Sequence, residues 1–285
     1  MNIEKKPLAP GLYFVATPIG AARDITLRAL DILASADVLA AEDTRTLRHL
    51  MQIHGVPLGE RPLIAYNDHN GAAVRPRLLG MIAADKSVAY ASEAGTPLIS
   101  DPGFQLGKEA QIAGALVTSA PGPSAVMAAL AVAGLPTDRF MFVGFAPTGK
   151  GARATWLAQL QAVPATLVLY ESPKRIQRLL TEMSEVFGAE RPASICRELT
   201  KRFEEVLQGG LAELADRVAA KSLKGEIVLV VDRDHRTAST ESLEDALRNA
   251  LTEMSVKDAA AAVATALELP KRQVYQAALA MAKAD

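Results

Sequence analysis

Polar side chains follow three of the apolar runs in this sequence, and each cluster mixes residue types that can move protons or hold charge. Glu42–Arg45 combines two carboxylates with an arginine, and Asn67–Asn70 surrounds a histidine with two amides and an acid. Glu198–Lys201 places a lysine three residues after a glutamate. Histidine is the commonest general base in enzymes, so His69 could accept a proton. Lys201 could hold a phosphate or ease the loss of a proton from a hydroxyl.

Each cluster also has a purely structural explanation. Asp43 could cap a helix and pair with Arg45, His69 could be an ordinary surface residue, and Lys201 could form a solvated ion pair with Glu198. We favour catalytic roles, in which His69 or Lys201 handles a proton while Asp43 and Glu198 orient these groups. The residues expected to contact a substrate are Arg45, Asn67, Asp68, Tyr170, Lys174 and Arg175.

Three further loops are rich in glycine, proline and small hydroxyl residues: Thr17–Gly20, Ser92–Pro97 and Ala120–Ser124. Glycine lets the backbone approach a ligand closely, and proline limits the ordering that this approach requires. Any one of them could be an ordinary turn. Together they favour a backbone-lined pocket for a polar small molecule. The residues predicted to hold it are Pro18, Gly20, Ser92, Gly95, Thr96, Pro97, Pro121 and Ser124.

Common cofactor and nucleophile motifs are missing from the sequence. It contains no G-x-G-x-x-G at the first loop, no phosphate-binding G-x-x-x-x-G-K-[ST] and no G-x-S-x-G elbow. The four histidines have no metal-ligand spacing, and the single cysteine excludes a multi-cysteine metal site. We therefore expect no metal.

The elements that must position these loops alternate between apolar runs and helical patterns. Runs that resemble buried strands cover residues 11–17, 37–43, 63–68, 87–95 and 116–122, and Asp24 or Thr26 begins the first helix. This order predicts a parallel sheet with right-handed crossovers. The carboxyl ends of such strands form the edge where ligands bind, and the three loops follow strands there.

The pattern restarts after Gly134-Leu135-Pro136. Strand candidates cover residues 139–147, 166–172, 192–199, 203–209 and 225–232, and three alanine-rich helices follow, with Ser255 as an N-cap and Pro270 at a helix start. We predict an α/β protein with an N-terminal α/β domain (1–134), a C-terminal α/β domain (135–235) and a small helical appendix (236–285).

Composition restricts the possible partners. The chain of 285 residues is 49% apolar and has a formal net charge of −1, so no broad basic field indicates nucleic acid. Residues 150–202 nevertheless carry nine basic and five acidic side chains, a local excess suited to phosphate contact. The lone Cys196, the polar N-terminus and the absence of an apolar run of about 18 residues predict a cytoplasmic protein without membrane contact.

Nine separated motifs, in order over residues 11–232, resemble one known family. They are TPIGA-x-x-DIT-x-RAL (17–30), AAEDTR (40–45), NDHN (67–70), SEAGTPLISDPG (92–103), APGPSA (120–125), GLPTDRF (134–140), YESPKRI (170–176), RELTK (197–201) and KGEIVLVV (224–231). This family is the ribosomal RNA small-subunit methyltransferase I group of the tetrapyrrole methylases. The resemblance implies a homodimeric two-domain enzyme that holds S-adenosyl-L-methionine (SAM) between its domains. It also implies 2′-O-methylation of a 16S ribosomal RNA cytidine, position 1402 in the customary numbering.

The sequence departs from the family pattern at Ala16, Ala21 and Glu93, where proline, asparagine and aspartate are usual. Loss of the amide at Ala21 puts a hydrogen bond from that loop in doubt. Two other functions compete: a tetrapyrrole C-methyltransferase of cobalamin or sirohaem synthesis, and a non-catalytic RNA- or ribosome-binding relative. The modest net charge favours an assembled small ribosomal subunit over naked RNA as the substrate.

Overall fold

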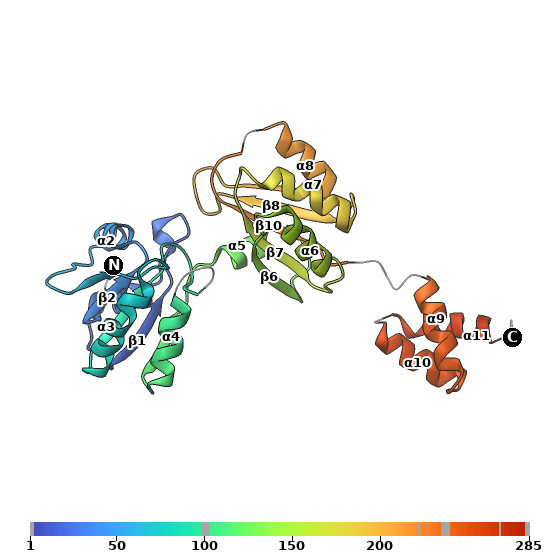
Figure 1. The fold of residues 1–285 in the computed structure, drawn as a ribbon, viewed down its shortest axis with the longest axis horizontal. Coiled ribbons are helices and arrows are strands. Elements are labelled where there is room, and N and C mark those ends of the chain that lie inside the picture. Colours follow the sequence, from blue (N-terminus) through green and yellow to red (C-terminus); the bar gives the residue numbers. More distant parts are fainter. Residues whose placement is uncertain (1–2, 99–102, 222, 235–239, 268, 283–285) are drawn as a thin grey trace. The chain divides into compact units, whose positions relative to one another are not determined.

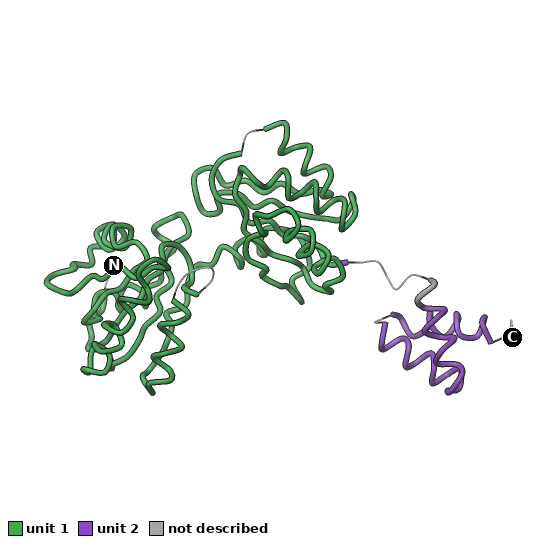
Figure 2. The backbone as a smooth tube through the Cα atoms, viewed as in Figure 1, with its two compact units in different colours: residues 1–233 green, residues 234–285 purple. Residues whose placement is uncertain are grey.

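The computed structural model describes residues 3–98, 103–221, 223–234, 240–267 and 269–282. The chain forms two compact units, Met1–Arg233 and Asp234–Asp285 (Figure 2). The predicted boundary at residue 235 lies outside the described residues, as do positions 99–102 of the SEAGTPLISDPG motif. The three-domain division itself stays a prediction.

The first unit begins with the predicted parallel sheet. Its strand order is β3-β2-β4-β1-β5, and every pairing is parallel. All residues of β1, β2 and β4 are buried, as expected for strands with helices on both faces. The strands are β1 (Gly11–Val15), β2 (Val38–Ala41), β3 (Leu63–Ala65), β4 (Ser87–Ala91) and β5 (Leu116–Ala120).

Helices cover this first sheet on both faces (Figure 1). One apolar cluster joins α1 and α2 to the sheet, and a second joins α3 and α4 to the opposite side of the same strands. Thr26 is the N-cap of α1, because its hydroxyl accepts a hydrogen bond from the Ala29 amide at 3.2 Å. The helices are η1 (Ala22–Asp24), α1 (Leu27–Ser35), α2 (Thr44–Ile53), α3 (Gly71–Ala83) and α4 (Gly103–Ile112).

The second sheet is mixed rather than parallel. In the order β6-β7-β10-β8-β9, only β6 and β7 are parallel. The alternation of strand and helix breaks at β8 and β9, which form a hairpin with no helix between them and therefore pair antiparallel. The strands are β6 (Phe140–Phe145), β7 (Thr166–Glu171), β8 (Pro192–Arg197), β9 (Glu205–Gly210) and β10 (Ile227–Val231).

The two faces of the second sheet are covered by different parts of the chain. On one face lie α6 (Lys150–Leu160), α7 (Ile176–Phe187) and α8 (Leu211–Ala219). The other face receives α5 (Ala125–Val132), which follows the first sheet in the sequence. Val126 and Leu130 of α5 belong to the same buried cluster as Val168 and Val228 of the second sheet. This helix therefore fastens the two sheets together.

The second unit is a small bundle of three helices, α9 (Thr240–Leu251), α10 (Val256–Ala266) and α11 (Lys271–Met281). Its core is built from Leu247, Val263 and Val274 together with several alanines. The predicted caps are confirmed: the Ser255 hydroxyl accepts from the Asp258 amide at 3.2 Å, and Pro270 directly precedes α11.

The cap at Ser255 gives a test of this bundle. Ser255→Ala leaves the first turn of α10 without its acceptor, which should cost about 1 kcal/mol. Amide hydrogen exchange in α10 should then accelerate about fivefold, whereas Ser255→Asp, which restores an acceptor, should exchange at the rate of the unaltered protein. Equal protection in the alanine and aspartate variants would show that the cap does not stabilise the helix.

Candidate functional site

The three glycine- and proline-rich loops meet at the carboxyl edge of the first sheet. Thr17 and Gly95 form an isolated antiparallel bridge in which each amide donates to the other carbonyl at 3.0 Å. The Ser92 hydroxyl donates to the Gly95 carbonyl at 2.7 Å, which fixes the turn between them. The Thr96 hydroxyl donates to the Pro123 carbonyl at 2.9 Å. Hydrogen bonds thus join loops that are far apart in the sequence.

Glycine is required at two points in this junction. Gly95 has φ of +80°, a left-handed conformation that residues with a side chain rarely adopt. A Cβ at Gly122 would lie 2.8 Å from the Cβ of Ala16, so the third loop can pack on the first only without a side chain there. The sequence signal of small residues therefore reflects close backbone approach.

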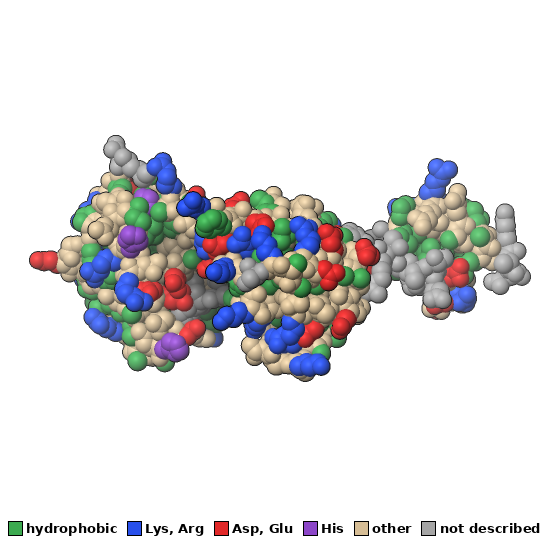
Figure 3. Space-filling model, turned by 90° about the horizontal axis from the view of Figure 1, so that it is seen from above, with side chains coloured by type: hydrophobic (Ala, Val, Ile, Leu, Met, Phe, Trp, Pro, Cys, Tyr) green, Lys and Arg blue, Asp and Glu red, His purple; other side chains and the backbone are tan. Residues whose placement is uncertain are grey.

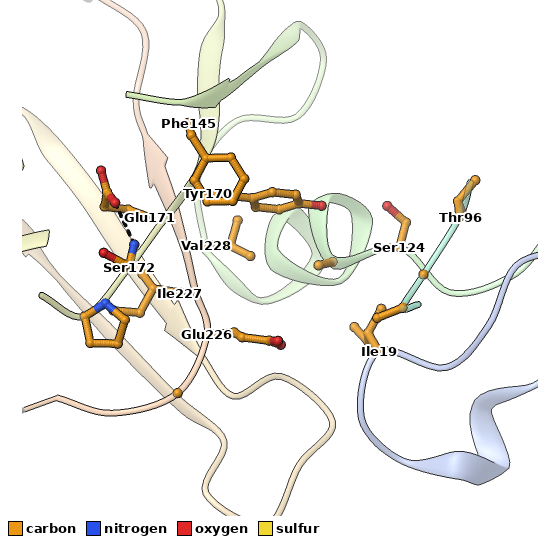
Figure 4. Close-up of a pocket in the computed structure, with 15 residues that line it drawn as sticks. Ile19, Thr96, Ser124, Phe145, Tyr170, Glu171, Ser172, Glu226, Ile227 and Val228 are labelled. Carbon is orange, nitrogen blue, oxygen red and sulfur yellow. Dashed lines mark hydrogen bonds between the residues drawn. The ribbon is translucent and has the colours of Figure 1, made fainter. Parts of the chain in front are cut away.

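A cavity of about 350 Å³ opens between these loops and the second sheet (Figure 4). Four of the predicted ligand residues line it: Gly95, Thr96, Ser124 and Tyr170. In Figure 4 the Tyr170 side chain points across the cavity toward Ser124. Burial, and secondarily the charge of Glu226, raises the pKa of Tyr170, so its hydroxyl stays a hydrogen-bond donor at neutral pH. The other lining residues are Ile19, Ala94, Ala125, Phe145, Glu171, Ser172, Pro173, Gly225, Glu226, Ile227 and Val228.

The other predicted cofactor residues lie in the same loops but outside this lining. They are Pro18, Gly20, Ser92, Pro97 and Pro121. Two of them, Ser92 and Gly20, shape the loops through contacts outside the lining. Ser92 holds the carbonyl of Gly95, and a Cβ on Gly20 would lie 2.5 Å from Cγ of Lys201. Gly20 therefore lets the first loop pack directly on a loop of the second sheet.

That second loop, Glu198–Lys201, has an unusual backbone. Glu198 and Thr200 have φ of +50° and +62°, in the left-handed region that non-glycine residues rarely adopt. Surrounding contacts hold them there: the Thr200 hydroxyl accepts from the Ala21 amide at 3.1 Å. The backbone of Ala21 thus bonds across the two halves of the unit, although its side chain offers no amide. Strained residues of this kind concentrate at functional sites.

Lys201 lies between two carboxylates. Its Nζ is 3.0 Å from Oε1 of Glu198 and 2.8 Å from Oε2 of Glu226. Burial alone would lower the pKa of Lys201, but the bonds to Glu226 and Glu198 together raise it above its ordinary value. The Glu226 amide and then Lys201 hold the pKa of Glu198 below its usual range. Lys201 is therefore a cation and Glu198 an anion at neutral pH, and the two are in direct contact. The orienting role of Glu198 stays a prediction.

Asp43 and Arg45 lie at the start of α2 and do not line the cavity. Asp43 is the N-cap: its Oδ1 accepts from the Arg45 amide at 2.7 Å, and its Oδ2 pairs with the Arg45 guanidinium at 2.8 Å. The Arg45 side chain and then its amide lower the pKa of Asp43 to about 2. The structure thus contains the helix cap and salt bridge that the sequence offered as the alternative to catalysis, while the Arg45 side chain is 90% exposed.

The Asn67–Asn70 cluster forms the turn that leads into α3. Asn67 Oδ1 accepts from the amides of His69 and Asn70 at 3.1 and 3.2 Å, and Asn70 Oδ1 accepts from the Asn67 amide at 2.8 Å. Asp68 and His69 are exposed, and none of the four lines the cavity. The concentration of amides is explained by turn formation. The structure does not bring His69 to Lys201.

Glu171, the residue after Tyr170, is an acid that also lines the cavity. The Glu171 carboxylate is 2% exposed and accepts from the Ser172 amide at 2.6 Å and from Arg175 Nε at 2.7 Å. Arg175, predicted to bind substrate, is therefore engaged in holding this buried acid. Lys174 beside it is exposed.

Much of the positive charge in residues 150–202 is paired within the protein. Arg153 bonds Glu182, Arg197 bonds Glu205, and Arg175 and Lys201 bond the acids described above. Acidic side chains lie among the basic ones on the face that Figure 3 shows. The local excess of basic residues therefore overstates the charge available to a phosphate backbone.

Glu226 and Phe145 were missed in the sequence. The sequence prediction placed ligand residues at the ends of strands, but Glu226 immediately precedes the strand β10. Because β10 runs antiparallel to β7, with Ile227 opposite Glu171, the beginning of β10 lies at the same edge as the end of β7. A mixed sheet thus brings both kinds of terminus to the cavity. The sequence signal was KGEIVLVV, in which a glycine and an acid precede an apolar run.

The described residues contain neither a metal-binding cluster nor a membrane-spanning helix. No group of three or more histidine, cysteine, aspartate or glutamate residues among them could hold a metal ion. No helix in the same part of the chain is long and apolar enough to cross a membrane.

Sequence comparison defines the class of protein to which this arrangement belongs. Residues 11–215 match the family of Tetrapyrrole (Corrin/Porphyrin) Methylases, and residues 237–282 match the RsmI C-terminal HTH domain. The chain belongs to the ribosomal RNA small subunit methyltransferase I family. It is 46% identical to the member from Mesorhizobium japonicum, over 96% of this chain and 93% of that protein. It is 43% identical to the member from Pseudomonas aeruginosa, over 94% and 96% respectively.

Solved structures agree on the fold. Uroporphyrin-III C-methyltransferase from Thermus thermophilus, complexed with S-adenosylhomocysteine, superposes with a TM-score of 0.54 at 19% identity. The match covers 78% of this chain and 97% of that one. At this identity the likeness shows the tetrapyrrole methylase fold and leaves substrate and site residues to be argued from this chain.

The bond between Thr200 and Ala21 gives a test of how the two halves are held. Thr200→Val keeps the side-chain shape but leaves the partly buried Ala21 amide without its acceptor, which should lower the free energy of unfolding by about 1 kcal/mol. Thr200→Ser keeps a hydroxyl and should lose less. Urea unfolding of the full chain measures both. Equal midpoints for the valine and serine variants would show that this bond does not hold the halves together.

Proposed function

We propose that this protein transfers the methyl group of SAM to the 2′-hydroxyl of a cytidine in 16S ribosomal RNA, position 1402 in the customary numbering. The observation that carries the proposal is the junction of the three loops, which forms a cavity directly beside the Glu198–Lys201 loop. Relatives at 43–46% identity are named as small-subunit ribosomal RNA methyltransferases, which supports the same substrate class here.

The cavity fits SAM in size and chemistry. Its volume of about 350 Å³ falls within the range of small-molecule sites, roughly 300–1,000 Å³. The backbone around Gly95 and Ser124 offers polar groups, and Ile19, Ile227 and Val228 offer apolar surface. We assign cofactor contact to the predicted loop residues that line the cavity, Gly95, Thr96 and Ser124. The other predicted residues shape the same loops without lining the cavity; they are Pro18, Gly20, Ser92, Pro97 and Pro121. When bound, SAM supplies an activated methyl group, and we propose no metal.

Lys201 is proposed to act on the ribose hydroxyl as a cation. Its raised pKa keeps it protonated at neutral pH, so it eases the loss of the O2′ proton by stabilising the developing negative charge. Glu198 holds the ammonium in place at 3.0 Å. His69 is proposed as the proton acceptor, with Asp43 fixing the start of α2. Because His69 lies in an exposed turn outside the cavity lining, this role requires an approach that RNA binding would have to produce.

The proposed substrate is a small ribosomal subunit in the cytoplasm. With a net charge of −1 and many basic side chains paired internally, the protein has little general attraction for free RNA. In an assembled particle the RNA already has a fixed shape, so binding depends less on general electrostatic attraction. Arg45 and Lys174 have exposed side chains suited to phosphate, Asn67 and Asp68 lie in the turn before α3, and Tyr170 faces the cavity. Arg175 is proposed to act on the substrate site indirectly, by holding the Glu171 carboxylate that lines the cavity.

Lys201→Met tests the chemistry. The variant should still bind SAM in calorimetry, because Lys201 does not line the cavity, yet transfer methyl from labelled SAM to small subunits at least about tenfold more slowly. Lys201→Arg, which keeps the charge, should recover part of the rate. A porphyrinoid precursor serves as the competing acceptor. Near-full single-turnover rates in Lys201→Met, or methylation of the porphyrinoid alone, would defeat the proposal.

The pH dependence of the single-turnover rate identifies the proton acceptor. A histidine base gives a rate that rises near pH 6–7, as the imidazole loses its proton. His69→Ala should abolish that rise and slow the reaction at least about tenfold at pH 8. Lys201 should add no step in this range because its pKa is raised. A profile that is unchanged in His69→Ala would remove His69 from the mechanism.

A homodimer is proposed from exposed apolar side chains on the first unit. Phe140, Met141 and Phe145 of β6 and Met127 and Val132 of α5 are all exposed, and β6 is an edge strand. Exposed apolar surface next to a sheet edge indicates a protein interface. Light scattering at micromolar concentration should give twice the 30.2 kDa chain mass, whereas Met141→Glu should shift the mass toward one chain. A monomer for the unaltered protein at all concentrations would contradict the proposal.

A further inference from the structure

Two carboxylates share a single ammonium beside the cavity. Lys201 Nζ contacts both Glu198 Oε1 at 3.0 Å and Glu226 Oε2 at 2.8 Å. The two acids and one base together carry a net charge of −1. With one ammonium between two carboxylates, one negative charge is left uncompensated in this group.

That charge resides on Glu226. Glu198 is 17% exposed, and its Oε1 accepts from the Glu226 amide at 2.9 Å as well as from Lys201. Gly225 encloses it further, since a Cβ there would lie 2.4 Å from the Glu198 carboxyl carbon. The Glu226 side chain, by contrast, is 77% exposed. Within the described parts of the chain its Oε1 has no hydrogen-bond partner, whereas Oε2 bonds Lys201.

Glu226 also faces the ligand side. It lines the cavity, and Figure 4 shows its carboxylate extending from the second sheet toward Ile19. The other acid in the lining, Glu171, is 2% exposed and is occupied by Arg175 and the Ser172 amide. The remaining lining side chains are uncharged. A ligand in this cavity therefore meets one accessible negative charge.

We infer that Glu226 is a specificity residue that favours the positively charged sulfonium of the methyl donor over the uncharged thioether of the spent product. This inference rests on the proposed function. The ammonium group of the ligand is the other possible partner, but it is present in both donor and product. The sulfonium is favoured because Glu226 bonds Lys201, which is proposed to lie beside the hydroxyl that receives the methyl group. The reacting sulfur must lie near the same point.

Such a contact makes the cavity bind the methyl donor more tightly than the spent product. Opposite charges a few ångströms apart attract one another, and the attraction disappears when one of them is lost. Glu226 keeps its bond to Lys201 but loses its attraction to the sulfonium once the donor has become a thioether, so the product is held less firmly than the donor. Specificity is a difference between two affinities, and here one carboxylate sets it.

Calorimetry of the full chain with SAM and with S-adenosylhomocysteine tests the inference. Glu226→Gln has the same shape, can still accept from Lys201 and removes the charge. It should weaken SAM binding at least about tenfold and change binding of S-adenosylhomocysteine less than about threefold. Glu226→Asp should keep much of the preference for SAM. Glu213→Gln on α8, which neutralises an exposed acid away from the cavity, is the matched control and should alter neither.

The outcomes are distinguishable. A selective loss of SAM affinity that diminishes at high salt supports the inference, because salt screens a partly exposed charge pair. Equal weakening of both ligands would assign Glu226 to their common ammonium and overturn it, as would unchanged affinity for both. Failure of the unaltered protein to bind either ligand would instead remove the proposed cofactor, and the inference with it.

Discussion

The bridge between Thr17 and Gly95 is the contact on which the edge of the first sheet depends. Two hydrogen bonds of 3.0 Å tie the residue after β1 to the loop after β4, and the left-handed backbone of Gly95 makes the turn possible. Ser92 fixes the Gly95 carbonyl, and Thr96 next to it binds the loop after β5. The amides and carbonyls of Thr17 and Gly95 and the carbonyl of Pro123 are thereby satisfied within the three loops, which leaves a concave surface of defined shape beside them.

On the side of the second sheet, the site is formed by the Glu198–Lys201 loop, which lies outside regular secondary structure and is held by ion pairs and hydrogen bonds. The left-handed residues Glu198 and Thr200 present Lys201 toward Glu226, and the Ala21 amide of the first half bonds Thr200. Gly20 permits this approach because any side chain would overlap Lys201. The backbone of one loop therefore positions the cation of another, across a long separation in sequence.

Sequence predicted the first sheet well because its three central strands, β1, β2 and β4, are buried on both faces and appear as continuous apolar runs. The cap at Ser255 was also predicted, and Thr26 was one of two predicted starts of the first helix, since capping is a local interaction. The mixed order of the second sheet was not, because strand direction depends on pairing between distant segments. Glu226 was missed for the same reason. Local patterns also could not show that the Asn67–Asn70 residues bond one another in a turn.

The position of α5 limits how the two halves can move. Its buried side chains, Val126 and Leu130 among them, belong to the core of the second sheet, while Ser124 and Ala125 at its start line the cavity. Pro123, one residue earlier, is bonded to Thr96 of the first half. A hinge between the halves would have to bend within this one or two-residue span, against a proline ring. The main chain at this point thus restricts separation of the cavity walls, which leaves the open side of the cavity as the route for a ligand.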